Sequence, residues 1–531
     1  MDWDIVIRKC RVVDGTGRAA VPGEIGIRGG RIGEVGPACL GTAARTIDAG
    51  GMVACPGFID MHTHSDLMLL AEPAAAAKVM QGVTTEVIGQ DGLSYAPATD
   101  ATLAQFRADF KGINGDPPGI AWDWRTVAEF LDRFDRRTSV NVAMLAPHGN
   151  LRAAVLGMEN RRASPEELGR MTRLLEQAMD EGAFGLSTGL TYAPCSYADT
   201  EELVALCRAT ARRGGFFAPH LRSYGADMEA AVREAFAICA AAECPLHLTH
   251  FQASFSTGKG KAGFYLQQIQ QARRQGLDVT LDAYPYLAGS TFLAGLLPSW
   301  VHEGGRARLR DRLSDPAIRD KIRREIEFVG ADGMHKVPVD WSVVVVSDVG
   351  SAPRSDWIGL SLAKIAERSG RPAFDCYADL ILESDLAAAC VTFIGHEENL
   401  QAFLRDGQFM GSSDGILVGA RPHPRAWGAF ARFLARYVRE LGVLTLEECV
   451  RKLTALPAAR LGLADRGFLR PGCHADLVIF DPAAVQDTAT YENPRSHPEG
   501  IPYVIVNGVL VKDNGRHTGA TPGRALRHVT A

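Results

Sequence analysis

In the middle of the chain, short apolar runs alternate with longer segments whose apolar residues recur at helical spacing. Each short run is bounded by turn residues, which is typical of a buried strand. Strands that alternate with helices favour parallel βαβ units and an α/β fold. Eight such runs predict a TIM-type (β/α)8 barrel; they lie at residues 57–62, 84–89, 141–145, 184–187, 215–220, 246–250, 279–283 and 409–414.

Both ends of the chain have a different pattern, in which short β-rich runs follow one another through Gly-rich turns. At the start, the runs at residues 4–7, 11–13, 23–28 and 31–35 are typical of hairpins with one covered face. The far end repeats this pattern at residues 475–480 and 503–511. We therefore expect both ends to form one small β-sandwich domain, residues 1–56 and 466–531, beside a barrel domain at residues 57–465.

The alternation breaks between about residues 287 and 345, a stretch too long for an ordinary connection between a strand and a helix. It combines Leu297-Pro298-Ser299-Trp300, a charged helical pattern and a valine-rich run at 343–346. We interpret it, together with the chain up to about residue 400, as an insertion or lid over the site.

Composition narrows the classes of function. The 531 residues carry a net charge of −5 with no basic stripe, which argues against a nucleic-acid partner held by charge. No apolar stretch reaches the roughly 18–20 residues of a membrane span, and the N-terminus lacks the pattern of a signal peptide. The 11 cysteines are scattered singly, which is typical of reduced thiols. We expect a cytoplasmic protein without a membrane partner; whether it forms a homo-oligomer is left open.

The chemistry begins with His62 and His64, which lie two residues apart at the end of the first predicted strand. Because side chains alternate along a strand, both imidazoles point to the same face, where they can share one zinc ion. The alternative is a pair of hydrogen-bonded histidines near a turn. The Pro56-Gly57 turn and the apolar strand before the motif favour the metal site.

Further metal-binding side chains follow other predicted strands. His220 and His250 each end a strand, and Asp414 ends the last one, where it can touch metal and handle protons. A carboxylated lysine at the end of the fourth strand can bridge two metals in barrels of this type, but the fourth strand here contains no lysine. The best remaining candidate for the bridge is Asp91, just past the second strand. Alternatively, Asp414 caps a helix and Asp91 is a turn residue. His247 points to the opposite face from His250 and is assigned to packing.

With these residues in place, the chain resembles the N-acyl-D-amino-acid deacylases (D-aminoacylases) of the amidohydrolase superfamily. The resemblance covers nearly the whole length. The HxH motif marks the superfamily, whereas the Asp-Ala-Tyr-Pro-Tyr and Arg-Pro-His-Pro-Arg segments are specific to this family. The segments that carry it are residues 56–64, 82–85, 185–190, 282–291, 411–415, 421–425 and 471–478.

The resemblance implies a zinc ion held tightly by His220 and His250, with a weaker or empty second site near His62, His64 and Asp414. The family usually has a cysteine where this chain has Asp91. An oxygen ligand binds zinc less tightly than a thiolate does, so one or two zinc ions remain open.

The resemblance also implies three residues that hold the substrate's α-carboxylate: Tyr284, Ser290 and Arg425. A planar guanidinium can grip a carboxylate with two hydrogen bonds. The family usually adds a lysine two residues after the His250 position, where this chain has Gln252. Either Lys259 or Lys261 on the same loop replaces its charge, or the substrate differs from that of the family; both alternatives stay open.

The predicted function is zinc-dependent hydrolysis of the amide bond of N-acyl-D-amino acids, with Asp414 as general base for a metal-activated water. The apolar residues around Leu293–Trp300 favour a hydrophobic amino-acid side chain, and no arginine lies between Tyr284 and His302. Two alternatives stay open: a hydrolase of cyclic amides or dipeptides from the same superfamily, and a non-catalytic barrel that serves as a scaffold.

Overall fold

A computed structural model describes residues 2–529, and its centre is a set of short parallel strands. Pairing joins β6 to β8 and β8 to β9, a six-stranded sheet runs in the order β10-β11-β12-β13-β14-β18, and β19 pairs with β7. Because β6 leads directly into β7, β9 into β10 and β18 into β19, these pairings follow a circuit of eight parallel positions. The strands are β6 (Phe58–Asp60), β7 (Thr63–His64), β8 (Val83–Ile88), β9 (Asn141–Met144), β10 (Ala146–Pro147), β11 (Gly185–Gly189), β12 (Phe216–His220), β13 (Leu246–Leu248), β14 (Val279–Ala283), β18 (Phe409–Gly411) and β19 (Gly415–Ile416).

Each of the eight predicted runs overlaps one of these strands, so the strand predictions and the mixed α/β class are confirmed. Helices occupy the connections, as α7 illustrates. Its N-cap Ser164 accepts from Glu167 N–H while Glu167 accepts from Ser164 N–H, and Pro165 fits the first turn. Helices on or near the circuit are α1 (Met68–Ala71), α2 (Ala76–Val79), α3 (Asp100–Asp109), α4 (Lys111–Asn114), α5 (Val127–Asp132), α6 (His148–Leu156), α7 (Pro165–Asp180), α8 (Thr200–Arg212), α9 (Met228–Ala242), α10 (Phe255–Gly258), α11 (Ala262–Arg274), α16 (Glu397–Leu404), α17 (Arg425–Arg432), α18 (Leu446–Leu453) and α19 (Ala455–Arg460).

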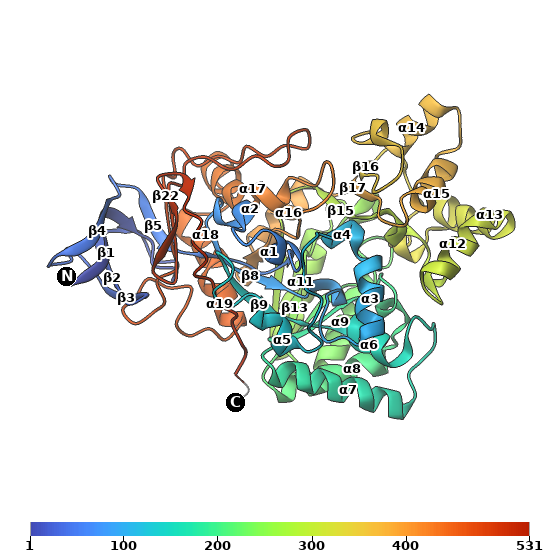
Figure 1. Ribbon diagram of the computed structural model, residues 1–531, viewed down its shortest axis with the longest axis horizontal. Coiled ribbons are helices and arrows are strands. Elements are labelled where there is room, and N and C mark those ends of the chain that lie inside the picture. The colour runs from blue at the N-terminus through green and yellow to red at the C-terminus, as the bar shows by residue number, and fades with distance from the viewer. Residues whose placement is uncertain (1, 530–531) are drawn as a thin grey trace.

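The two chain ends share one sheet, at the left of Figure 1. The runs predicted at 4–7 and 11–13 are not two strands but one, β1, and that detail of the prediction was wrong. Lys9, at φ 52°, lies where the register shifts between Ile7 and Cys10, so a bulge continues the strand. The β-sandwich domain at residues 1–56 and 466–531 stays a prediction. The sheet order is β23-β22-β21-β20-β5-β1-β2-β3, with β4 on β1: β1 (Trp3–Val12), β2 (Val21–Arg28), β3 (Arg31–Gly36), β4 (Ala43–Asp48), β5 (Val53–Pro56), β20 (Leu477–Phe480), β21 (Tyr503–Val506), β22 (Val509–Asp513) and β23 (Arg516–His517).

At the opposite end of the molecule in Figure 1, a separate group of elements follows β14. Its antiparallel sheet has the order β15-β17-β16, and it has a hydrophobic core of its own. The group contains the stretch predicted as an insertion at about 287–345, whose exact limits stay a prediction. Its elements are β15 (Ala288–Phe292), β16 (Val344–Asp348), β17 (Ala389–Phe393), α12 (Arg306–Ser314), α13 (Pro316–Arg324), α14 (Leu362–Ser369) and α15 (Ala373–Glu383).

Across residues 2–529, every helix is too short or too polar to cross a bilayer.

Candidate metal centre

His62 and His64 stand where β6 passes into β7, and both are buried. Their rings meet edge to face, with centroids 5.3 Å apart. Thr63 between them turns the other way, where its Oγ1 accepts from Lys78 Nζ at 2.8 Å. The alternation expected of a strand therefore directs both imidazoles toward one space.

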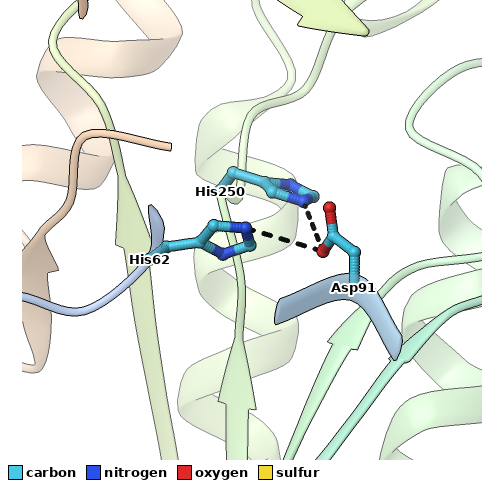
Figure 2. Close-up of side chains that lie close together, drawn as sticks. All are labelled: His62, Asp91 and His250. Carbon is cyan, nitrogen blue, oxygen red and sulfur yellow. Dashed lines mark hydrogen bonds and ion pairs between the residues drawn. The ribbon is translucent and has the colours of Figure 1, made fainter. Parts of the chain in front are cut away.

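Asp91 faces four histidines. Its Oδ1 lies 3.6 Å from His62 Nε2 and 3.4 Å from His250 Nε2. Figure 2 shows these two rings directed at the same carboxylate oxygen. Its Oδ2 lies 3.5 Å from His64 Nε2 and 3.7 Å from His220 Nδ1. The carboxylate is thus the common neighbour of all four predicted histidine ligands.

The turn that carries Asp91 explains this position. Gly89 has φ 74°, and Asp91 itself has φ 55° in the short 3-10 turn Gln90–Gly92. Asp is among the few side chains that adopt a left-handed conformation at modest cost. A Cβ on Gly89 would lie 2.3 Å from the carbonyl oxygen of Leu145, so glycine is required there.

The donor set fits a zinc ion. Zinc binds imidazole nitrogen and carboxylate oxygen at about 2.0–2.2 Å, which places neighbouring ligands of a tetrahedron roughly 3.3–3.5 Å apart. The contacts of Asp91, at 3.4–3.7 Å, lie close to that spacing and are long for hydrogen bonds. Both ring nitrogens of His62 and Nδ1 of His64 are buried without a hydrogen-bond partner among the described residues. Two trios bring their ligand atoms within 4.8 Å of one another: His62, Asp91 and His250, and His62, His64 and Asp414.

His220 and His250 are held by side chains outside the predicted ligand set. His220 Nε2 pairs with Thr191 Oγ1 at 2.9 Å, while its Nδ1 lies 3.1 Å from His250 Nε2. Asp282 Oδ1 accepts from the His250 backbone N–H at 3.0 Å. Its other oxygen pairs with His247 Nε2 at 2.8 Å, so His247 is occupied away from the centre.

The cluster keeps its carboxylates ionised. Burial alone raises the pKa of Asp91, but the surrounding histidines, His62 and His250 foremost, outweigh it and hold the pKa well below its usual range. Burial also raises the pKa of Asp414, yet Arg425 and then the histidines lower it on balance. Both side chains are therefore acceptors at neutral pH, as metal ligands and a proton acceptor must be.

Asp414 joins the histidine cluster to the predicted carboxylate site. Its Oδ1 lies 3.3 Å from His64 Nε2 and 3.6 Å from His62 Nε2, and its Oδ2 lies 2.8 Å from Arg425 Nη1. Asp414 precedes β19 at φ 46° and does not cap a helix.

Arg425 is 1% exposed, and its guanidinium makes few hydrogen bonds and ion pairs for a buried cation. Its Nη2 donates to Ser290 O at 3.3 Å, and its guanidinium carbon lies 4.4 Å from the centre of the Tyr284 ring. Its Nε is buried without an acceptor in the part of the chain that the structure describes. Ser290 Oγ donates to Cys390 O at 3.0 Å. The three residues predicted to hold the α-carboxylate therefore lie together beside Asp414.

Neither Lys259 nor Lys261 supplies the positive charge that the family's lysine has at the position of Gln252, so that prediction was wrong. Gln252 Nε2 donates to the carbonyl oxygens of Tyr284 and Tyr286, at 3.2 and 3.3 Å. Lys259 and Lys261 are exposed and do not line the cavity at the cluster. Lys259 follows α10 directly and Lys261 precedes α11 directly.

A cavity of about 100 Å³ opens on the cluster. The segment after β15 covers it: His335 lies over His220, with ring centroids 5.9 Å apart, and its Nδ1 accepts from Tyr224 N–H. The sequence offered no signal for His335, because it lies far from any predicted strand end. Arg425 is the one Lys or Arg among the described residues that line the cavity. The apolar residues that line the cavity include Leu296, Met334, Val343, Val344 and Ile394.

Comparison with known proteins identifies the family of the chain. A model of the amidohydrolase family matches residues 45–308 and 359–512. The chain is 34% identical to the D-aminoacylase of Alcaligenes xylosoxydans xylosoxydans, over 100% of this chain and 98% of that protein. The chain belongs to the D-aminoacylase family of amidohydrolases. It is therefore an amide-hydrolysing enzyme, as the sequence predicted.

Two further relatives of this D-aminoacylase-family chain add detail. The N-acyl-D-glutamate deacylase of Alcaligenes xylosoxydans xylosoxydans is 36% identical, over 99% of this chain and 96% of its own. A crystal structure of the N-acyl-D-glutamate deacylase from Bordetella bronchiseptica, complexed with zinc and a phosphonate inhibitor, matches with a TM-score of 0.82 at 33% identity. That match covers 99% of this chain and 100% of the other. The amidohydrolase fold is thus shared over the full length.

Proposed function

We propose that the chain is a zinc-dependent N-acyl-D-amino-acid deacylase that prefers neutral, apolar D-amino acids. Its eight parallel positions are taken to form a (β/α)8 barrel, with the site at the carboxyl ends of the strands. The observation that carries the proposal is Arg425, a buried cation with an unused Nε donor, placed beside Asp414 at the edge of the histidine cluster. A free α-carboxylate is the ligand that this donor lacks.

The residues proposed to hold zinc are His62, His64, Asp91, His220, His250 and Asp414. When bound, zinc supplies a Lewis acid that polarises the scissile carbonyl and lowers the pKa of water. Asp91 is proposed as the ligand that the histidines share, because its two oxygens divide the four histidines between them, and this arrangement leaves both one and two zinc ions open. The orphaned nitrogens of His62 and His64 support a ligand role for that pair as well.

Asp414 is proposed as the general base. Its Oδ1 faces the cluster and its Oδ2 faces Arg425, so it stands between the attacking water and the substrate's carboxylate end. It accepts the water's proton and delivers it to the departing amide nitrogen. Its lowered pKa keeps the carboxylate unprotonated at neutral pH, as a proton acceptor must be.

Arg425 is proposed to bind the α-carboxylate through Nε, with Tyr284 stacked against its guanidinium. Ser290 lies in the same cavity, and its hydroxyl must leave Cys390 O before it can donate to a substrate. An acidic side chain would find no second Lys or Arg among the described residues that line the cavity, and Leu296, Val343 and Ile394 line it too. The preference for a D-configured substrate rests on the names of the relatives.

The 11 free, buried cysteines support the predicted cytoplasmic setting, in which thiols stay reduced.

The test is a hydrolysis screen of N-acetyl-leucine, N-acetyl-glutamate and N-acetyl-aspartate in D and L forms, with and without added zinc. We expect zinc-dependent release of D-leucine at the highest kcat/KM. Activity confined to L-substrates, or hydrolysis of dihydropyrimidines in place of linear amides, would overturn the proposal. A protein that binds no zinc and is not stimulated by it would favour the scaffold alternative.

A further inference from the structure

A second cavity, of about 50 Å³, lies next to the cavity at the metal centre. Tyr192 lines both. The second cavity is enclosed mainly by apolar side chains that come from the start of the chain and from the segment after β14. They include Leu93, Phe106, Phe110, Phe292, Leu309 and Leu386.

One side-chain layer separates the two cavities. The Tyr192 ring stacks on Phe292, with centroids 5.8 Å apart and planes 27° apart, and its other neighbour is His220, at 5.0 Å. The Tyr192 hydroxyl pairs with Thr291 Oγ1 at 3.1 Å. Rotation of Tyr192 would therefore connect the second cavity with the space beside the predicted ligands.

The polar residues that line the second cavity offer no free positive charge. Arg306 lies 3.5 Å from Asp109 and 2.9 Å from Asp385, so two carboxylates neutralise it. Burial lowers the pKa of His302 to about 4, which leaves its imidazole neutral. Burial also raises the pKa of Asp109. An anionic group would find no partner here.

We propose that the second cavity receives the aliphatic end of the substrate's acyl chain, so that butanoyl and hexanoyl substrates are preferred over acetyl and succinyl ones. This inference rests on the proposed function. That proposal places the substrate's α-carboxylate and its amino-acid side chain, and the inference places the remaining part, the acyl chain. A mainly apolar cavity favours apolar occupants over water. Each methylene that enters it should raise kcat/KM by roughly fourfold.

The first test measures kcat/KM for N-acetyl-, N-butanoyl-, N-hexanoyl- and N-succinyl-D-leucine with the zinc-loaded enzyme. We expect butanoyl to exceed acetyl by roughly fifteenfold, from two buried methylenes, and succinyl to fall below butanoyl. An acyl profile that is flat or falls from acetyl onward would overturn the inference while leaving the deacylase function intact.

A matched pair of variants tests the location. Leu309 and Leu313 lie one turn apart on α12, both are buried, and only Leu309 lines the second cavity. Leu309→Ala should raise the hexanoyl-to-acetyl ratio of kcat/KM severalfold, whereas Leu313→Ala should leave it within twofold of the wild type. Equal ratios in the two variants would overturn the assignment of this cavity.

A binding measurement keeps the inference independent of turnover and of variant folding. Calorimetric titration of wild-type, zinc-loaded protein with acetate and with hexanoate compares the two acyl products directly. Hexanoate should bind at least tenfold more tightly than acetate. Equal affinities would refute the acyl cavity, whereas tight hexanoate binding without hydrolysis of any N-acyl substrate would refute only the proposed function.

Discussion

Replacing Arg425 by methionine should abolish the enzyme's preference for substrates with a free α-carboxylate. Arg425 is buried, and its donors are already divided: Nη1 faces Asp414 at 2.8 Å and Nη2 faces Ser290 O at 3.3 Å. Its Nε is buried with neither an acceptor nor an ion pair in residues 2–529. The α-carboxylate is therefore expected to gain at least one charge-assisted hydrogen bond, through Nε.

That single bond sets the magnitude. A hydrogen bond to a charged group contributes roughly 1.5–3 kcal/mol, which corresponds to about 10–150-fold in kcat/KM. Arg425→Met also leaves Asp414 without its ion pair, and breaking a buried pair costs roughly 3–5 kcal/mol of stability. This second cost affects every substrate equally, so it cancels in a ratio between two substrates.

The assay is accordingly a cycle of two proteins and two substrates, N-acetyl-D-leucine and N-acetyl-D-leucinamide. The wild type should favour the free acid, and Arg425→Met should reduce the acid-to-amide ratio of kcat/KM by about 10–150-fold. Arg425→Lys, which keeps the charge but loses the planar fork, should give an intermediate ratio. A ratio that stays within twofold of the wild type in Arg425→Met would refute the carboxylate role.

Three further predictions concern Asp414, Asp91 and Lys512. Asp414→Asn should lower kcat by about 10²–10⁴-fold while the circular dichroism stays unchanged; near-normal turnover would contradict the general-base role. Asp91→Cys should tighten zinc binding by roughly tenfold or more in a chelator competition, and Asp91→Ala should weaken it; equal zinc affinities in all three proteins would show that Asp91 is not a ligand. Lys512 is 2% exposed, and burial lowers its pKa to about 8 in the folded protein from 10.5. The unfolded chain therefore binds more protons between pH 8 and 10.5, so stability should rise with pH across that range. Lys512→Met should raise the melting temperature at pH 7 and do so less at pH 10; a gain that is independent of pH would contradict the assignment.

Much of the fold was predictable because its signals are local. The eight strand runs are apolar over their own length, and the first turn of α7 carries its cap, its proline and its early acids within four residues. The error at β1 has a local cause too. Asn, Asp and Gly signal a left-handed residue, but Lys9 adopts φ 52° without such a signal, so the bulge was invisible.

The predicted metal ligands cluster for the same reason, since each was chosen for its place at or just past a strand end. Tyr284, Ser290 and Arg425 were instead implied by the family resemblance. The prediction that Lys259 or Lys261 replaces the family's lysine charge was wrong, because a position in a loop does not show whether its side chain points into the site or toward solvent. Lys259 and Lys261 lie on the loop named but point to solvent. His335 and Thr191, which contact His220, belong to segments where no periodic pattern points to the site.

By itself the sequence determined which side chains of a strand point to the same face. Side chains alternate along a strand with a period of two, so a few neighbouring positions are enough to set this. His62 and His64 share a face for that reason alone. The tertiary structure decided which side chains face one another: Asp91 meets His250 from 159 positions away, and Tyr192 closes against Phe292 between two cavities. Such contacts depend on how elements distant in the chain pack, which no local period encodes.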